Sequence, residues 1–443
     1  MYHDSYEYYN ASWTPGFPEA FLQKRGYDIR DHFAELAGVG ESAQIAKVKH
    51  DYRETLSDLI IEDVFPRWVA WCHSRGIKTR NEAHGAPANW LDFYALADIP
   101  ETEMFGCGRD DGDNPLESRL DSRISHGDRD ILISKMASSA ANVKAAIEGR
   151  TAPVLASSES CTWMAEHFCE TLEGVKGFVD RLFLAGINHI YYHGLCYSPV
   201  DAPWPGWCFY ASLEMNPRNP IWRDADALNR YFTEVQSVTQ TCEPDNDLLV
   251  YWPIHDFWTD PEGFEKQLAV HALDWFHGQP FGKIAKKLYD SGYAFDFASD
   301  RQLAALAKVP KTHYTTILVP AAKTMPGATF RALERLEAKG YCVVFAECVP
   351  RIEPGLQAKE LHCTARSVKG DWLKDAPVRR EPFNKENGLM YTRYRASGGE
   401  SVYFIVNQEK ELVEGDFTTS DAKTVRLRLP FGHSCISRDA VVT

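Results

Sequence analysis

Helical and strand-like segments alternate along the first 242 residues, and this alternation restricts the fold more than any other feature. Apolar residues recur at helical spacing over 63–75, 131–149 and 171–185. Short apolar segments follow these helices at 77–79, 153–157 and 187–192. Strands that alternate with helices form a parallel sheet covered by helices. We therefore predict an α/β fold for residues 1–242, either a barrel of the (β/α)8 type or a doubly wound sheet.

The pattern changes near residue 243, where a second series of strand-like segments begins. We expect buried strands over 248–252, 315–319 and 341–346, with an amphipathic helix over 327–339. This predicts a flavodoxin-like α/β domain at 243–352. Beyond that point the helical spacing disappears. Strand-like segments joined by Gly-rich turns predict a β-sandwich segment at 353–443, which we expect to be incomplete.

The charge balance excludes several classes of partner. The chain has 48 Lys and Arg against 62 Asp and Glu, which gives a net charge of −14. A nucleic-acid-binding protein presents a basic face, and an anionic membrane surface attracts basic segments. No uncharged apolar run reaches the ~18 residues that a membrane span needs. We expect neither a nucleic acid nor a membrane as partner.

Polar side chains follow the predicted strands, at the positions where a barrel carries its reactive groups. These candidates are Asp4, Glu7, Glu82, His84, Glu101, Glu103, Glu159 and His193. One glutamate in such a place is most often only solvated, but carboxylates at four successive strand ends favour a shared role. Two roles remain open. The carboxylates could form the general acid and general base of a glycosidase, or they could be oxygen ligands for a hard cation such as Ca²⁺.

Aromatic residues lie in or near the loops beside the same strand ends. They are Trp90, Trp163, Tyr197, Trp204 and Trp207. The flat C–H faces of sugars pack on aromatic rings, while sugar hydroxyls remain free for carboxylates and imidazoles. Ordinary packing of these rings is an equally open explanation. Together with the acidic residues, they favour an enzyme that acts on a neutral, ring-shaped ligand.

Several of these segments occur in a fixed order that resembles a known family. They are Asp4-Ser5-Tyr6-Glu7, Glu82-Ala83-His84-Gly85, Asp98-Ile99-Pro100-Glu101-Thr102-Glu103, Ser158-Glu159-Ser160-Cys161-Thr162-Trp163 and Tyr192-His193-Gly194. In this order they resemble glycoside hydrolase family 106, the α-L-rhamnosidases, over residues 1–350. The resemblance implies an (α/β)8 barrel with β-sandwich companions. It also implies an inverting glycosidase that removes terminal α-L-rhamnose from glycans or glycosides.

The resemblance assigns roles by position. Glu159 would be the general acid and Glu7 the general base. A Ca²⁺ ion near the sugar hydroxyls is implied, with Glu101 and Glu103 as its ligands. The sugar would be bound by Asp4, Glu82, His84, Trp163, His193 and Trp207. Two other functions stay open: a glycosidase with another sugar specificity, and a non-catalytic carbohydrate-binding remnant.

The strand count differs from that of the family. Counting from Met1 gives five of the eight strands, so we expect 1–242 to contain the C-terminal five β/α units of a barrel without its N-terminal part. The resemblance suggests a periplasmic or secreted protein. The opening segment MYHDSYEYYN has neither the basic nor the apolar region of a signal peptide. The compartment therefore stays unknown.

Overall fold

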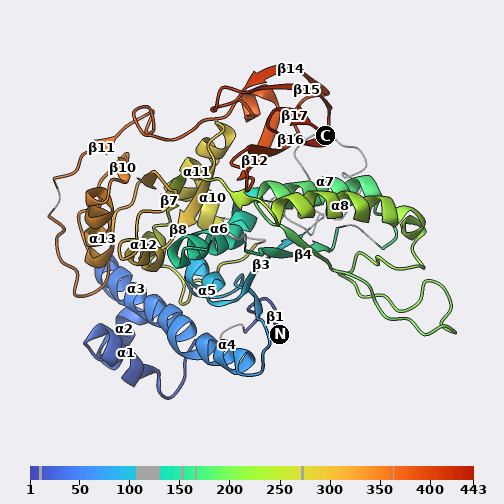
Figure 1. Ribbon diagram of the computed structural model, residues 1–443. Coiled ribbons are helices and arrows are strands. Elements are labelled where there is room, and N and C mark those ends of the chain that lie inside the picture. The colour runs from blue at the N-terminus through green and yellow to red at the C-terminus, as the bar shows by residue number, and fades with distance from the viewer. Residues whose placement is uncertain (9–11, 106–129, 151–153, 165–166, 271–273, 363) are drawn as a thin grey trace.

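The computed structural model describes residues 1–443 apart from 9–11, 106–129, 151–153, 165–166, 271–273 and 363. Over these described ranges, the strands form three five-stranded sheets and a two-stranded hairpin (Figure 1). Helices surround the first two sheets, and the hairpin and all but one strand of the third sheet come from the C-terminal end of the chain. Among the described residues, no helix has the length and apolar character needed to cross a membrane.

The first sheet is parallel, and its strands lie side by side in sequence order. They are β1 (Tyr2–His3), β2 (Arg80–Glu82), β3 (Ile99–Phe105), β4 (Ser157–Thr162) and β5 (His189–Tyr192). Neighbouring strands in sequence order are typical of an α/β barrel, in which each strand is followed by a helix. The mixed α/β fold with a parallel sheet is thus confirmed for this part of the chain.

Two strands of this sheet begin later than the sequence pattern predicts. The strands expected at 77–79 and 153–157 are found at Arg80–Glu82 and Ser157–Thr162, and residues 151–153 lie outside the described part. The apolar segments on which the two predictions were based lie just before the strands in the chain. The strands themselves are polar, because one of their faces carries buried polar side chains rather than an apolar core. As a result Glu159 lies inside β4 and not after it.

The helices predicted over 131–149 and 171–185 begin and end near the predicted residues. The described helices of the first part are α1 (Phe17–Arg25), α2 (Phe33–Leu36), α3 (Ser42–Asp58), α4 (Phe65–His73), α5 (Trp90–Leu96), α6 (Ile131–Glu148), α7 (Leu172–Leu184) and α8 (Ala225–Thr239). The helix expected over 63–75 differs, because a π-helical segment at Leu59–Val64 joins α3 to α4. Pro66 at the start of α4 has no N–H to donate, which disrupts regular helical bonding there.

The second sheet is also parallel, in the order β11-β10-β9-β7-β8. Its strands are β7 (Leu248–Tyr251), β8 (Phe295–Ala298), β9 (Thr316–Val319), β10 (Cys342–Ala346) and β11 (Ser367–Val368). Read along the chain, this is the 2-1-3-4-5 order typical of flavodoxin-like sheets. The associated helices are α9 (Ile254–Trp258), α10 (Asp274–His277), α11 (Pro280–Asp290), α12 (Asp300–Leu306) and α13 (Gly327–Ala338).

The first two sheets share one apolar core through α6. This helix packs against β3 of the first sheet and β8 of the second, and the core that it forms includes Met136, Leu248 and Phe295. A second core on the other face of β7 and β9 is formed with α12 and α13. One face of the flavodoxin-like sheet therefore packs into the same core as the first sheet, and only its other face has a separate core.

The third sheet is antiparallel and begins earlier in the chain than expected. Its order is β17-β16-β13-β12-β6, with β6 (Glu243–Pro244), β12 (Leu389–Arg395), β13 (Ser401–Asn407), β16 (Ser434–Arg438) and β17 (Val441–Val442). The hairpin of β14 (Leu412–Thr418) and β15 (Thr424–Pro430) packs against it through a shared apolar core. Strand β6 precedes the second sheet, and β11 lies beyond residue 352. The expected boundaries at 243 and 353 therefore do not coincide with the sheet pairing, since two-residue strands carry no pattern that a sequence could show.

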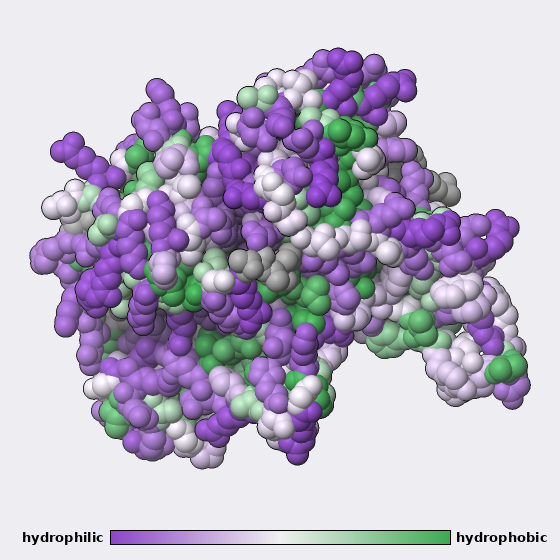
Figure 2. Space-filling view, in the orientation of Figure 1, coloured by the Kyte–Doolittle hydropathy of each residue, from purple (hydrophilic) through white to green (hydrophobic). Residues whose placement is uncertain are grey.

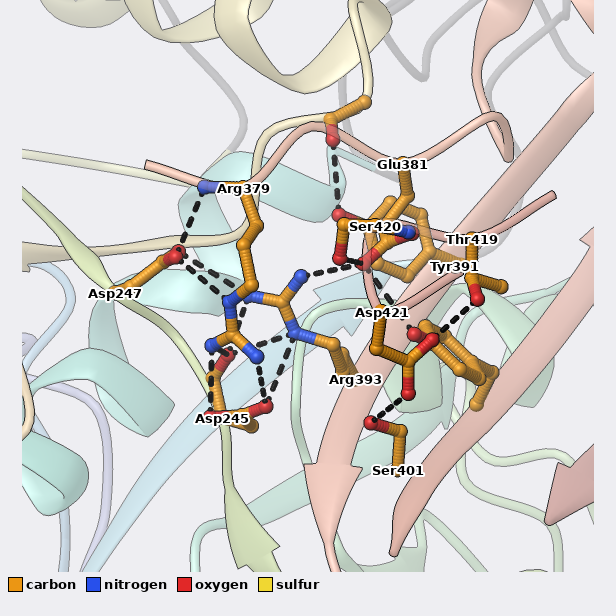
Figure 3. Close-up of polar contacts among 12 residues, drawn as sticks. Asp245, Asp247, Arg379, Glu381, Tyr391, Arg393, Ser401, Thr419, Ser420 and Asp421 are labelled. Carbon is orange, nitrogen blue, oxygen red and sulfur yellow. Dashed lines mark hydrogen bonds and ion pairs between the residues drawn. The ribbon is translucent and has the colours of Figure 1, made fainter. Parts of the chain in front are cut away.

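A buried polar network joins the second and third sheets (Figure 3). The guanidinium group of Arg393 in β12 donates to Glu381 Oε1 at 2.7 Å, to the Asp245 carbonyl at 2.8 Å and to Asp247 Oδ1 at 3.1 Å. Arg379 forms two hydrogen bonds with the Asp245 carboxylate, at 2.8 and 2.9 Å. Asp245 and Asp247 stand between β6 and β7, so the network fixes the segment that connects the two sheets.

A second polar contact joins α5 to the second sheet. The hydroxyl of Ser299, which caps α12, donates to Asp92 Oδ1, and Arg301 Nε lies 3.7 Å from Asp92 Oδ2. Asp92 is buried, and burial raises the pKa of its carboxyl to about 7. The folded protein therefore holds this proton at pH values at which the unfolded chain has released it.

This raised pKa predicts a pH-dependent effect of Asp92→Asn. Between pH 5 and pH 7 the folded state binds more protons at Asp92 than the unfolded state, so wild-type stability falls as the pH rises. The asparagine cannot ionise and keeps an oxygen for Ser299. The free energy of unfolding of the variant minus that of the wild type should therefore increase by about 2–3 kcal/mol when the pH is raised from 5 to 8. Urea unfolding at both pH values measures this change, and a pH-independent difference would contradict it.

Candidate functional site

The polar residues of the first sheet gather on one face of it. Side chains two residues apart in a strand point to the same side. The strand register pairs Tyr2 with Arg80, Glu82 with Glu101, and both Glu103 and Tyr191 with Glu159. This places the following side chains on a common face: Tyr2, Arg80, Glu82, Glu101, Glu103, Glu159 and Tyr191. We call them the carboxyl cluster.

Glu159 is at the centre of the carboxyl cluster. Its Oε2 atom lies 2.9 Å from the Tyr2 hydroxyl, and its Oε1 atom accepts a hydrogen bond from Thr162 Oγ1 at 3.1 Å. His193 Nδ1 lies 3.7 Å from the same Oε1. Glu103 is paired with Glu159 in the strand register, so the two carboxyls are neighbours. Glu159 is therefore held in place from strands β1 and β4, with His193 of the loop after β5 facing it.

The Tyr2 hydroxyl connects three carboxyl groups. Its oxygen lies 2.6 Å from Glu82 Oε1, 2.9 Å from Glu159 Oε2 and 3.2 Å from Asp4 Oδ1. A tyrosine hydroxyl carries one hydrogen and can donate to one carboxylate at a time. The remaining short contacts are favourable when a facing carboxyl holds a proton and donates it to the tyrosine oxygen. The arrangement therefore suits a cluster that contains at least one protonated carboxyl.

His84 lies between two buried glutamates. Its Nε2 atom is 2.9 Å from Glu103 Oε2, and its Nδ1 atom is 3.4 Å from Glu82 Oε2. Burial lowers the pKa of His84 to about 4, so the ring is neutral at pH 7. A neutral ring that donates from Nε2 to Glu103 presents an acceptor at Nδ1, which fits a protonated Glu82.

Glu101 has a different environment from the other carboxyls. Its Oε2 atom accepts a hydrogen bond from Ser157 Oγ and faces Arg80 Nε at 3.1 Å. The Arg80 guanidinium is stacked between the rings of Tyr2 and Tyr191, at 4.2 and 3.8 Å from their centroids. Glu101 thus balances the charge of Arg80 at the base of the cluster.

Three members of the cluster were not among the candidates from the sequence: Tyr2, Arg80 and Tyr191. A signal for them existed, because each stands two residues before a candidate, namely Asp4, Glu82 and His193. Residues two apart on a strand share a face. Reactive groups in a barrel are expected after the strand ends, so positions within the strands were not predicted.

Asp4 and Glu7 lie at the exposed margin of the cluster. Asp4 accepts a hydrogen bond from the backbone N–H of Ser5 at 2.9 Å, and Glu7 accepts one from Ser5 Oγ at 3.4 Å. The negative charges of both carboxylates act on the buried ring of His84. Glu7 thus lies near His84, and its side chain is in contact with solvent.

The three remaining candidates occupy the loops after β4 and β5. His193 faces Glu159, and its ring also contacts Phe209, with ring centroids 5.6 Å apart. Trp163 donates its backbone N–H to Ala211 at 2.8 Å and packs on Tyr210. Trp207 contacts Tyr197 in its own loop, 6.3 Å between centroids, and is 60% exposed. The described contacts bring His193 to the carboxyl cluster but leave Trp207 outside it.

Burial raises the pKa of the clustered glutamates. The pKa of Glu101 and of Glu103 rises to about 7 in each case, mainly because the carboxyls are removed from water. Burial also raises the pKa of Glu159, and the neighbouring Glu103 carboxyl raises it further. For Glu82 the same two effects raise the pKa well above its usual range. A site of this kind can hold a carboxylic acid in its protonated form near neutral pH, as a general acid requires.

Comparison with known proteins identifies the family. The family model of glycoside hydrolase 106, described as alpha-L-rhamnosidase, matches residues 1–381. The chain belongs to glycoside hydrolase family 106. The resemblance inferred from the ordered segments is thereby confirmed.

Solved structures share the family 106 fold of this chain. A rhamnosidase from Novosphingobium sp. PP1Y superposes with a TM-score of 0.72 at 20% identity, covering 100% of this chain and 44% of that one. An exo-carrageenase of family GH42 from Bacteroides ovatus gives a TM-score of 0.59 at 13% identity, covering 96% and 61%. At these identities the likeness shows the fold.

A curated relative covers a smaller part of the chain. A Formosa agariphila protein, provisionally named a beta-glucuronidase, is 27% identical over 254 residues, which is 56% of this chain and 19% of that protein. The chain therefore spans less than half the length of the rhamnosidase and about a fifth of the length of the curated relative.

Membership of family 106 implies a calcium ion, and the cluster contains ligands that suit one. Asp4, Glu82 and Glu159 each offer a carboxylate oxygen, and these oxygens lie within 4.8 Å of one another. Glu82 Oε2 is buried without a hydrogen-bond partner among the described residues. Calcium binds through oxygen atoms, so this set fits better than the neighbouring group of Glu82, His84 and Glu103, which includes an imidazole. Of the two predicted ligands, Glu103 belongs to the second group and Glu101 to neither.

Proposed function

We propose that the carboxyl cluster is the active centre of an inverting glycosidase that removes terminal α-L-rhamnose from glycans or glycosides. The observation that supports this most is the environment of Glu159. In a chain of family 106, Glu159 is a largely buried carboxyl with a raised pKa, on the cluster face of the parallel sheet. An inverting glycosidase uses one protonated carboxyl and one carboxylate on opposite sides of the scissile bond.

In this proposal Glu159 is the general acid. Burial and Glu103 raise the pKa of Glu159, which favours its protonated form, so it can protonate the leaving oxygen as the glycosidic bond breaks. Tyr2, Thr162 and His193 hold the carboxyl in position. Once the proton has been transferred, the imidazole of His193 can stabilise the resulting carboxylate.

Glu7 is the proposed general base. It is exposed at the margin of the cluster, where a water molecule can reach it. As an ionised carboxylate it can accept a proton from that water as the water attacks the anomeric carbon. Inversion requires the two carboxyl groups to stand about 6.5–9.5 Å apart, with the sugar and the water between them.

Calcium would complete the sugar-binding part of the site. Asp4 and Glu82 are the proposed ligands, and each offers a carboxylate oxygen to the same group of atoms. When bound, the ion would supply positive charge that holds the rhamnose hydroxyls. A carboxyl binds calcium in its ionised form, so Glu82 would release its proton when the ion binds, whereas Glu159 is assigned to proton donation.

The charge of the cluster favours a neutral sugar over a uronic acid. Six carboxyl groups lie in it or at its margin: Asp4, Glu7, Glu82, Glu101, Glu103 and Glu159. Arg80 could bind a carboxylate substrate, but it already faces Glu101 and is stacked between two tyrosine rings. A β-glucuronide, suggested by the name of the Formosa relative, would meet this negative charge without a free partner at Arg80.

The stereochemistry of the product tests this proposal. We expect hydrolysis of 4-nitrophenyl α-L-rhamnoside to release β-L-rhamnose first, which 1H NMR of the anomeric proton detects before mutarotation. 4-Nitrophenyl β-D-glucuronide and β-D-galactoside are the matched controls and should be hydrolysed at least about 100-fold more slowly, a difference of about 3 kcal/mol in transition-state stabilisation. Initial release of α-L-rhamnose would exclude the inverting acid–base pair, and preference for the glucuronide would exclude the rhamnosidase.

A further inference from the structure

The long loop after β5 exposes five aromatic side chains. We call Tyr197, Trp204, Trp207, Phe209 and Tyr210 the aromatic shelf. Tyr197 is 75% exposed and Trp204 67%, and the other three are also exposed. This loop projects from the body of the molecule beside α8 (Figure 1), and Figure 2 shows white and green patches on it, next to a face that is mostly purple. Soluble proteins rarely gather so many large rings on one projecting segment without a binding role.

The shelf is held in a fixed shape. The Arg218 guanidinium donates to the carbonyls of Pro199 and Ala202, both at 2.9 Å, and the Arg218 carbonyl accepts from Trp204 Nε1 at 3.2 Å. Trp207 donates its backbone N–H to Ser198 Oγ at 2.9 Å. These bonds use groups of the loop itself. They order the exposed rings before any ligand arrives, which lowers the entropy cost of binding.

The inner end of the shelf is continuous with the carboxyl cluster. The Phe209 ring contacts the ring of His193, which faces Glu159 at 3.7 Å. Tyr210 packs on Phe209 at 4.7 Å and on Trp163 at 5.4 Å between centroids. Buried Glu214 accepts the backbone N–H of Phe209 at 3.1 Å and so fixes this junction. A molecule bound at Glu159 and extending outward would pass over these rings.

The chemistry of the shelf suits neutral sugars. Residues 195–210 contain Asp201 and no Lys or Arg, and the Arg218 charge is used by backbone carbonyls. An anionic polysaccharide would therefore find no cation on this loop. Tyrosine and tryptophan combine a flat apolar face with a polar group, which suits sugar rings better than it suits an aliphatic protein surface.

We propose that the aromatic shelf binds the leaving-group side of a neutral, extended glycan whose terminal rhamnose occupies the carboxyl cluster. This inference rests on the proposed function for the position of the terminal sugar. The substrate class assigned to the shelf is rhamnose-capped neutral oligosaccharides. The role of the shelf is binding, which can be measured without hydrolysis. Several sugar residues contact the shelf, so affinity grows with the length of the glycan.

Calorimetric titration of the full chain tests the shelf with three probes: methyl α-L-rhamnoside, cellotriose, and cellotriose carrying α-L-rhamnose at its non-reducing end. We expect the rhamnosylated trisaccharide to bind about tenfold more tightly than the methyl glycoside, a difference of about 1.4 kcal/mol. Trp204→Ala and Trp207→Ala should each remove most of this difference and weaken binding of cellotriose. Trp71→Ala removes an exposed tryptophan of α4, far along the chain from the shelf, and should preserve the difference.

The outcomes separate this inference from the proposed function. Cellotriose binding that is lost in both shelf variants supports the shelf even if no rhamnoside is hydrolysed. Equal affinity for the methyl glycoside and the rhamnosylated trisaccharide overturns the shelf, even if rhamnosides are hydrolysed. Sedimentation that shows a dimer which both shelf variants dissociate would also overturn it, because the rings would then bind a second copy of the chain.

Discussion

Glu159→Gln should reduce the rate of hydrolysis of an alkyl or disaccharide α-L-rhamnoside by about 100- to 10,000-fold, the usual contribution of a general acid. Such leaving groups need a proton as the bond breaks, and the buried carboxyl with its raised pKa is the proposed donor. Glutamine keeps the size of the side chain and an oxygen for Tyr2 and Thr162. On 4-nitrophenyl α-L-rhamnoside the loss should be much smaller, because nitrophenolate leaves without protonation.

Glu7→Gln provides the matched comparison. The attacking water must be activated whatever group leaves, so this variant should lose activity on both substrates to the same extent. Steady-state kcat/KM values for the two variants on the two substrates give the four required rates. An equal loss on both substrates in Glu159→Gln would remove the acid assignment, and an active Glu7→Gln would remove the base.

Arg393→Met should lower the free energy of unfolding by about 3–5 kcal/mol, because the variant removes one partner from a buried ionic network. Arg393 is fully buried, and its guanidinium satisfies Glu381, Asp247 and the Asp245 carbonyl (Figure 3). Methionine fills a similar volume but leaves the buried Glu381 carboxylate without its cation. Urea unfolding followed by tryptophan fluorescence measures the loss.

Arg426→Met is the control for this prediction. Arg426 in β15 forms an ion pair with Asp416 at 2.7 Å, but both side chains are exposed, so water already screens the charges. The control should unfold at the same urea concentration as the wild type. If Arg393→Met also unfolds at the wild-type midpoint, the network does not stabilise the junction between the second and third sheets.

Local patterns in the sequence predicted those elements in which apolar side chains are buried and polar side chains are exposed. Helices α6, α7 and α13 lie within two residues of their predicted limits, because each has one apolar face that recurs with the helical period. Strands β7, β9 and β10 could be predicted because they are largely buried on both faces and therefore mainly apolar.

The same patterns could not place the strands that carry the candidate site. Strands β2 and β4 have polar side chains on the face that forms the carboxyl cluster, so the apolar run used to find strands ends before they begin. The strand was therefore predicted at 77–79, in the apolar segment that precedes β2. The polar character that makes these strands hard to recognise is also what makes them candidates for catalysis.

The sequence by itself determined which carboxyl groups are available and that several of them follow strands of one parallel sheet. Only the tertiary structure decided which of them meet. The Tyr2 hydroxyl reaches Glu82 and Glu159, 80 and 157 residues away, because the register of parallel strands puts them side by side. Burial then raises the pKa of these carboxyls, and burial depends on the packing of distant segments, which no local pattern encodes.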